Sequence, residues 1–233
     1  KFNEKNTELE KQYLLDTIDA EINDKRTYAT IRCKDVMCAE ELCSIKKYGY
    51  REDAMKITPE SAAKAYEELL RTARVEIMFE GCGDPTLAKD IFAQKFADVK
   101  REPIELSRSL VKAQQGAVKE ETERMEVKQG KLVMGFRVEG IEDYRRMNMA
   151  RITFALFGGT ANSLLFKNVR EKMSLCYYCS SGYDRSNSIM MVSSGVEEEN
   201  AQKARDEVLH QLEMLKNGEF TDRELEETKL FIR

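Results

Sequence analysis

Apolar and polar residues recur along this chain with two different periods, and these periods predict its elements. Apolar residues return at helical intervals over residues 7–22, and a helical composition resumes over 27–45. Two more helices are predicted where Thr58 and Asp84 can cap a first turn that opens with proline. Between these helices, "RVEIMFEG" over residues 74–81 has the two-residue alternation of a half-buried strand.

The second half of the chain predicts a similar set of elements. Alternating side chains indicate a strand near 130–138, and helical patterns follow over 143–157, where Gly158 and Gly159 end the first helix, and over 162–173. "LCYYCSSGY" and "IMMVSSGV" flank the turn residues 184–187 and predict an antiparallel hairpin. Two last helices are predicted, the first over 198–215 and closed by Asn217 and Gly218, the second opened by a capping box of Thr221 and Glu224.

This order of elements predicts an α+β fold with two related domains, each a mainly antiparallel sheet covered by helices. Residues 103–125 are polar and lack a clean period, so they are the predicted linker. Residues 1–102 then form the later part of a first domain, which we expect to be incomplete, and residues 126–233 form a second domain that is cut at its end. A start at Lys1 and a helix that runs into Arg233 without a stop signal favour a piece of a longer protein.

Composition narrows the class of partner. The chain has 233 residues, 42% of them hydrophobic, with 38 basic against 42 acidic side chains. Neither sign dominates, so a nucleic-acid or anionic-membrane partner is not expected. No apolar run approaches the roughly 18 residues that span a bilayer, and no secretory leader opens the chain. We therefore expect a cytoplasmic protein.

Six cysteines raise the possibility of a disulfide framework or a zinc site. Cys176 and Cys179 lie three apart in a predicted strand, where their side chains should point to opposite faces. Cys33, Cys38 and Cys43 are five apart, which is about 140° of helical rotation per step, so they should not share a helix face. The pattern favours reduced thiols that pack as small apolar side chains, and it predicts no metal in this chain.

Other chemical motifs are weak. Gly81 and Gly83 lie between a predicted strand and a helix, as in a dinucleotide-binding turn, but Thr86 takes the place of the third glycine. The one histidine, His210, lies in a predicted helix without a partner motif. Nucleotide binding and histidine-based acid–base catalysis are therefore not predicted.

Arg170 and Tyr177 are the best candidates for binding. Arg170 falls in the last turn of the predicted helix and Tyr177 at the start of the strand that follows, so both can project around one corner. A guanidinium offers five donors and a phenol offers a hydroxyl and an aromatic face, which together suit an extended peptide backbone. The alternative is that Arg170 pairs with a nearby carboxylate and Tyr177 packs in the sheet, and the residues alone favour this alternative.

At these residues the chain resembles the pitrilysin and insulinase family of zinc peptidases. The resemblance rests on "LFGGTANSLLFKNVREKMSLCYYCSSGY" and "GEFTDRELEETK", with "ELEKQYLLDTIDAEINDKRTYA" and "MKITPESAAKAYEELLRTARVEIMFEGCGD" in the first half, and "EVKQGKLVMGFRV" is similar to a bacterial branch. It implies two related α+β domains in a half-clamshell, with peptide held as an added strand. In that family an Arg and a Tyr seven residues apart in the second domain contact the substrate, which implies this role for Arg170 and Tyr177.

The resemblance also implies a zinc site in catalytic members, held by an H-x-x-E-H helix and a downstream Glu. No H-x-x-E-H is present here, and the position seven after Glu10, where the family has that Glu, is Thr17. A hydroxyl is a poor zinc ligand. The resemblance therefore favours a non-catalytic, peptide-binding subunit that acts with a catalytic partner as a homo- or heterodimer. Two alternatives stay open: an active zinc endopeptidase whose motif lies upstream of Lys1, and a scaffold subunit that binds no peptide.

Overall fold

The computed structural model describes residues 2–105, 117–138 and 143–232. By their contacts, residues 1–19 and 46–108 form one compact unit, here unit 1, and residues 20–45 and 109–233 form a second, unit 2. Residues 106–116, which make up much of the predicted linker, lie outside the described part. The boundary predicted at 103–125 stays a prediction.

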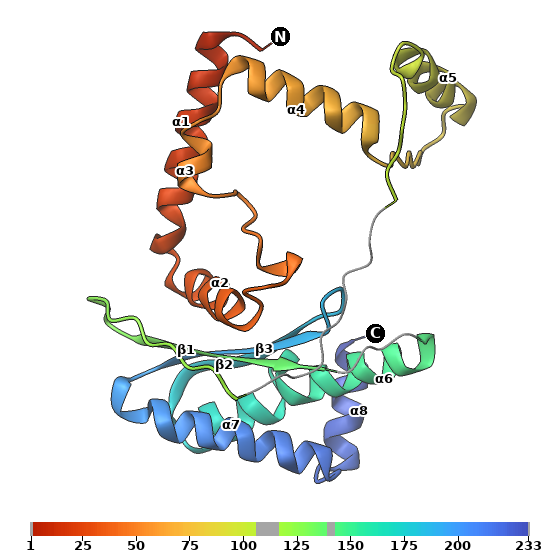
Figure 1. Cartoon of the computed structure of the whole chain (residues 1–233). Coiled ribbons are helices and arrows are strands. Elements are labelled where there is room, and N and C mark those ends of the chain that lie inside the picture. Colours follow the sequence, from red (N-terminus) through yellow and green to blue (C-terminus); the bar gives the residue numbers. More distant parts are fainter. Residues whose placement is uncertain (1, 106–116, 139–142, 233) are drawn as a thin grey trace. The chain divides into compact units, whose positions relative to one another are not determined.

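Unit 1 is helical in its described part (Figure 1). Its helices are α1 (Glu4–Ala20), α3 (Arg51–Ala54), α4 (Pro59–Thr72) and α5 (Pro85–Phe96). Thr58 caps α4 by accepting a hydrogen bond from the Ser61 amide at 3.2 Å, and Asp84 caps α5 by accepting one from the Thr86 amide at 2.8 Å. Both predicted caps are confirmed, each with proline in the first turn.

The prediction of a strand over residues 74–81 is wrong. These residues are not paired with another strand, because the described residues of unit 1 contain no other strand. The predicted alternation is nevertheless visible in the side chains. Val75, Ile77 and Phe79 all line one hollow of about 570 Å³, which α5 closes on its other side.

Unit 2 contains a three-stranded antiparallel sheet with the order β1-β3-β2. The strands are β1 (Gly130–Arg137), β2 (Cys176–Asp184) and β3 (Ile189–Val196). The Asp184 carboxylate accepts a hydrogen bond from the Asn187 amide group at 2.7 Å, which closes the turn between β2 and β3. The predicted hairpin and the predicted first strand are therefore confirmed.

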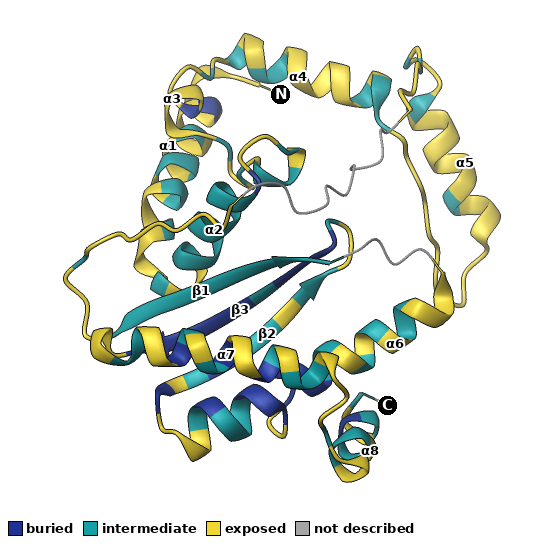
Figure 2. Ribbon diagram, turned by 60° about the horizontal axis from the view of Figure 1, so that its bottom comes forward, coloured by how far each residue is buried: buried dark blue, intermediate teal, exposed yellow. Residues whose placement is uncertain are grey.

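One face of this sheet carries the hydrophobic core. The helical segments that cover this face are α6 (Tyr144–Phe154), η3 (Ala155–Gly159), η4 (Leu165–Lys172) and α7 (Ala201–Lys216). The short η5 (Glu198–Asn200) leads into α7, and α8 (Asp222–Phe231) packs on α6 and η3. Figure 2 shows the buried residues along β3 and in the helical segments next to the sheet. Fully buried apolar side chains such as these contribute about 1.5–3 kcal/mol each. They include Phe157, Leu165, Val169, Val192 and Val208.

The other face of the sheet is covered by α2 (Lys25–Met37), which η1 (Glu21–Asn23) precedes and η2 (Leu42–Ser44) follows. The Arg26 guanidinium lies 4.3 Å from the centroid of the Tyr178 ring. At Gly135, an added Cβ would come within 2.6 Å of the Met37 sulfur, so the helix packs closely on β1. The sequence predicts residues 20–45 as part of the first block, but periodicity does not identify the surface that a helix packs on.

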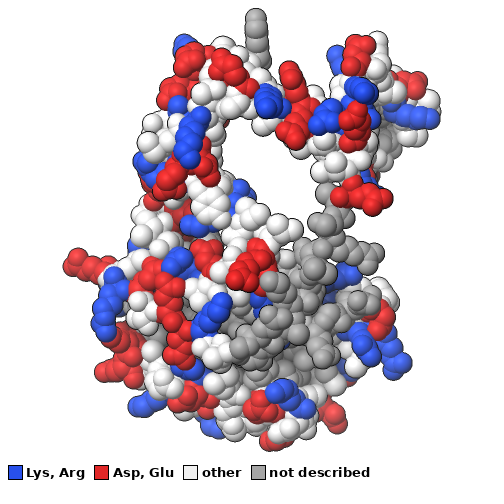
Figure 3. Space-filling view, in the orientation of Figure 1, with Lys and Arg blue, Asp and Glu red and all other residues white. Residues whose placement is uncertain are grey.

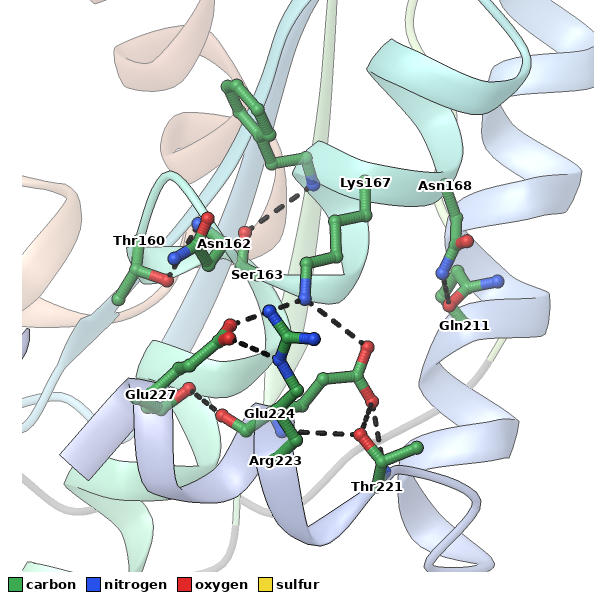
Figure 4. A network of polar contacts seen from close by, with 12 residues as sticks. Thr160, Asn162, Ser163, Lys167, Asn168, Gln211, Thr221, Arg223, Glu224 and Glu227 are labelled. Atoms are coloured by element: carbon green, nitrogen blue, oxygen red, sulfur yellow. Dashed lines mark hydrogen bonds and ion pairs between the residues drawn. The ribbon is translucent and has the colours of Figure 1, made fainter. Parts of the chain in front are cut away.

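The helix predicted over 162–173 is present, but η4 is wound as a π-helix. Polar contacts attach it to two later helices (Figure 4). Lys167 lies 3.5 Å from a carboxylate oxygen of Glu224 on α8, and the Asn168 side chain donates to Gln211 on α7 at 2.7 Å. These contacts fix the position of the helix that carries Arg170.

Charge on the described surface is mixed. On the face shown in Figure 3, Lys and Arg side chains lie among Asp and Glu side chains in both units. Many charged side chains of the described surface form exposed ion pairs, such as Lys216 with Glu213 at 2.7 Å. Of the helices in the described part, none has the length and apolar character needed to cross a membrane.

Candidate functional site

A sharp turn at Ser174 connects η4 to β2. Ser174 has a φ of +51°, the left-handed conformation that ends many helices and is more often adopted by glycine. The Leu175 amide donates to the Val169 carbonyl at 3.2 Å, which closes the helix end. Arg170, in the last turn of η4, and Tyr177, at the start of β2, therefore lie on either side of one corner.

A β-bulge at Tyr177 determines where its side chain lies. Cys176 is opposite Val196 and Tyr178 is opposite Gly195, so Tyr177 is an extra residue in β2 without a partner. Bulges of this kind often redirect a side chain next to a functional site. The Tyr177 side chain is 70% exposed.

Arg170 and Tyr177 both line a hollow of about 700 Å³. The Arg170 guanidinium lies 4.5 Å from the centroid of the Phe166 ring, and within the described residues no carboxylate forms an ion pair with it. The structure thus has neither the ion pair nor the packed tyrosine of the alternative interpretation. The hollow is lined by Arg170, Glu171, Ser174, Leu175, Cys176, Tyr177, Glu197 and Asn200.

The hollow combines a cation, two carboxylates, an amide and a thiol. A hydrogen bond with Cys179 lowers the pKa of the Cys176 thiol to about 7, against the effect of burial, and Ser194 and the charge of Arg170 add to the lowering. Hydrogen-bond donors and acceptors of this kind can pair with the carbonyl and amide groups of an extended peptide. That Arg170 and Tyr177 bind a ligand stays a prediction.

The prediction that Cys176 and Cys179 point to opposite faces is wrong. Both belong to the same buried core cluster, because the bulge at Tyr177 shifts the alternation of β2 by one residue. The extra residue is a tyrosine and not a glycine, so the sequence carries no signal for this bulge.

The prediction that Cys38 and Cys43 lie on different faces of a helix, and so apart, is also wrong. It assumes one continuous helix, but α2 ends at Met37, and the turn that follows brings both sulfur atoms together with Glu41. The two sulfur atoms and a Glu41 oxygen lie within 4.8 Å of one another. Cys33 lies earlier on α2, next to Gly135 of β1, and is not part of this group.

Among the described residues, those at and near the position where the resemblance places a zinc-binding Glu are poorly suited to hold that metal. The Thr17 hydroxyl donates to the Tyr13 carbonyl at 2.8 Å, so it is used within its own helix. The nearby Asp19 carboxylate accepts from Arg51 at 2.9 Å. His210 is exposed on α7. These residues do not fit the family's metal, and no catalytic step is assigned to them.

The helices on a small antiparallel sheet, with a hollow at a helix–strand corner, make unit 2 an α+β domain. Residues 56–230 match the family model described as the peptidase M16 inactive domain, and the chain belongs to this family. This result confirms the resemblance to the pitrilysin and insulinase peptidases.

Individual relatives agree with this family. The chain is 30% identical over 226 residues to the protein named probable inactive metalloprotease YmfF of Bacillus subtilis. The aligned region covers 96% of this chain and 52% of that relative. A conserved protein from Enterococcus faecalis has a solved structure with a TM-score of 0.87 at 25% identity, over 97% of this chain and 53% of that one. The solved structure of a peptidase M16 inactive domain from Pseudomonas fluorescens has a TM-score of 0.79 at 20% identity, over 100% of this chain and 56% of that one. The chain spans about half the length of these relatives.

Proposed function

We propose that this chain is part of a non-catalytic, peptidase-like subunit that binds extended peptide at the hollow between η4 and β2. The observation that carries the proposal is that Arg170 and Tyr177 lie on one hollow. Tyr177 is mostly exposed, and Arg170 has no ion-pair partner among the described residues. Both polar groups are therefore accessible to a ligand.

Each side chain has a distinct role in this proposal. The Arg170 guanidinium donates hydrogen bonds to peptide carbonyls or to a ligand carboxylate, and the Phe166 ring holds its plane. The Tyr177 ring covers the peptide and its hydroxyl pairs with a backbone group. Contacts to the backbone do not depend on peptide sequence, so the site accepts many unfolded segments.

We assign peptide cleavage to a catalytic partner and not to this chain. Thr17 occupies the position where a catalytic relative has a zinc-binding glutamate, and the similar B. subtilis protein is named a probable inactive metalloprotease. The partner is a second peptidase-like chain, identical or related. The six cysteines are free thiols, which supports a reducing compartment such as the cytoplasm.

Peptide affinity tests this proposal. The full-length protein that contains this chain is titrated against a labelled unstructured peptide, with Arg170→Ala and Tyr177→Ala as variants. Loss of a charged hydrogen bond costs about 1.5–3 kcal/mol, so Arg170→Ala should weaken binding by about tenfold or more. Arg185→Ala and Tyr144→Ala replace exposed residues of the same types as controls. Unchanged affinity in both test variants would favour a scaffold role instead.

A further inference from the structure

We propose that Cys38, Glu41 and Cys43 form a binding site for a thiophilic divalent cation of the zinc class, separate from the hollow at Arg170. The three residues follow the end of α2, and all three belong to unit 2. Nothing in the peptide-binding proposal requires this site.

The ligand atoms are close to the geometry that such a cation needs. The two sulfur atoms and a Glu41 carboxylate oxygen all lie within 4.8 Å of one another. In a tetrahedral zinc site with bonds of about 2.3 Å to sulfur, two sulfur ligands are about 3.8 Å apart. A movement of about 1 Å therefore suffices, and three protein ligands leave a fourth position for water.

Arg137 of β1 orients the Glu41 carboxylate. Its guanidinium donates to both oxygen atoms of Glu41, with the Nη1 to Oε2 distance at 3.0 Å, and it also donates to the Met37 carbonyl at 3.0 Å. The side chains of Arg137 and Glu41 are 13% and 12% exposed. A carboxylate has about four lone-pair positions, so two remain for a metal. Hydrogen bonds that orient a ligand in this way are typical of metal sites.

The charges also balance. Two thiolates, one carboxylate and a divalent cation sum to a single negative charge, which the Arg137 guanidinium offsets at 3.8 Å from the Cys38 sulfur. Metal binding replaces the protons of the two thiols, because cysteine ligates zinc-class cations as the thiolate. Two sulfur ligands select zinc-class metals over magnesium and calcium, which prefer oxygen.

Cobalt(II) binding provides a direct test, because cobalt replaces zinc and shows a charge-transfer absorption band only when thiolate coordinates it. The reduced, full-length protein is titrated with cobalt and then with zinc under anaerobic conditions. We expect the band to appear at one equivalent and to disappear when zinc displaces cobalt. Zinc content is then measured for the wild type, Cys38→Ser and Cys43→Ser.

We expect each serine variant to hold one zinc fewer per chain than the wild type. Cys33→Ser, which replaces a neighbouring thiol outside the group, is the matched control and should keep the metal. Arg137→Lys should weaken binding by about 10- to 100-fold. The wild-type cobalt spectrum does not depend on whether a variant folds. Absence of the band, equal zinc in the wild type and serine variants, or a Cys38–Cys43 disulfide in protein from cells would each overturn the proposal.

Discussion

The Arg170 guanidinium lies over the Phe166 ring, with 4.5 Å between the guanidinium carbon and the ring centroid. Both residues lie on η4, four positions apart. A cation over an aromatic face gains about 0.5–1 kcal/mol at an exposed site. The contact holds the planar donors of Arg170 in one orientation at the edge of the hollow.

Replacing this aromatic platform should weaken peptide binding without removing it. Phe166→Leu keeps an apolar side chain but loses the ring, so we expect affinity to fall by about 2- to 5-fold, which corresponds to about 0.5–1 kcal/mol. Fluorescence anisotropy with a labelled peptide measures this change. Phe231→Leu, an exposed aromatic on α8, is the control. An affinity equal to that of the wild type would show that Phe166 does not position Arg170.

Gly158 allows η3 to pack against β2. An added Cβ would lie 2.6 Å from the Ser181 backbone nitrogen and 2.8 Å from a Leu165 methyl group. We expect Gly158→Ala to lower the free energy of unfolding by about 1–3 kcal/mol, as overpacking usually does. Gly182→Ala on β2, where no atom lies within 4 Å of the added group, is the matched control for urea unfolding. Equal stability of the two variants would contradict this packing argument.

The contact between Lys167 and Glu224 predicts a dependence of stability on pH. Burial raises the pKa of Glu224, but hydrogen bonds from Thr221 and the charge of Lys167 outweigh it and keep the pKa below its ordinary value of 4.5. A group with a lowered folded-state pKa stabilises the fold fully above its ordinary value, and this contribution is lost as the pH falls through the folded-state value.

Urea unfolding over a series of pH values checks this dependence. Glu224→Gln should be less stable than the wild type at pH 7, and the difference should shrink as the pH falls below 4.5. Glu199→Gln, which changes an exposed carboxylate on η5, is the control. A difference that does not change with pH would contradict the prediction.

Cys176 is only 9% exposed, but it lines the hollow and is reached from there, so it should react as a thiolate near neutral pH. Its pKa is lowered to about 7 by the hydrogen bond with Cys179, so the rate of its alkylation by iodoacetamide should rise with a midpoint near pH 7. Cys179→Ala removes the hydrogen bond and should move the midpoint towards the ordinary value of 9.0. Mass spectrometry of the labelled peptide gives the rates. A midpoint near 9 in the wild type would show that Cys179 does not lower the pKa.

Local signals in the sequence predict most elements of this fold. Three kinds of local prediction are confirmed: the proline-containing first turns of the helices after Thr58 and Asp84, the capping box at Thr221, and the hairpin turn at Asp184. Each depends on residues within one turn of each other. The position of Arg170 near a helix end follows from the same kind of signal.

Features that depend on distant parts of the chain could not be predicted in this way. Pairing of residues 74–81 requires a second strand, and the bulge at Tyr177 arises from the register of β2 on β3. The end of α2 at Met37 brings Cys38 next to Cys43, although helical geometry alone would separate them. Only the family resemblance implies a binding role for Arg170 and Tyr177, and this role stays a prediction, whereas composition and periodicity favour the alternative.

Site-specific photocrosslinking tests the central proposal most directly. A benzophenone amino acid replaces Tyr177 in the full-length protein, and replaces Tyr144, which is 75% exposed, in a control variant. After irradiation with a labelled unstructured peptide, we predict a crosslink from position 177 that excess unlabelled peptide removes, and none from position 144. No crosslink at 177, or equal labelling at both positions, would contradict peptide binding at this hollow.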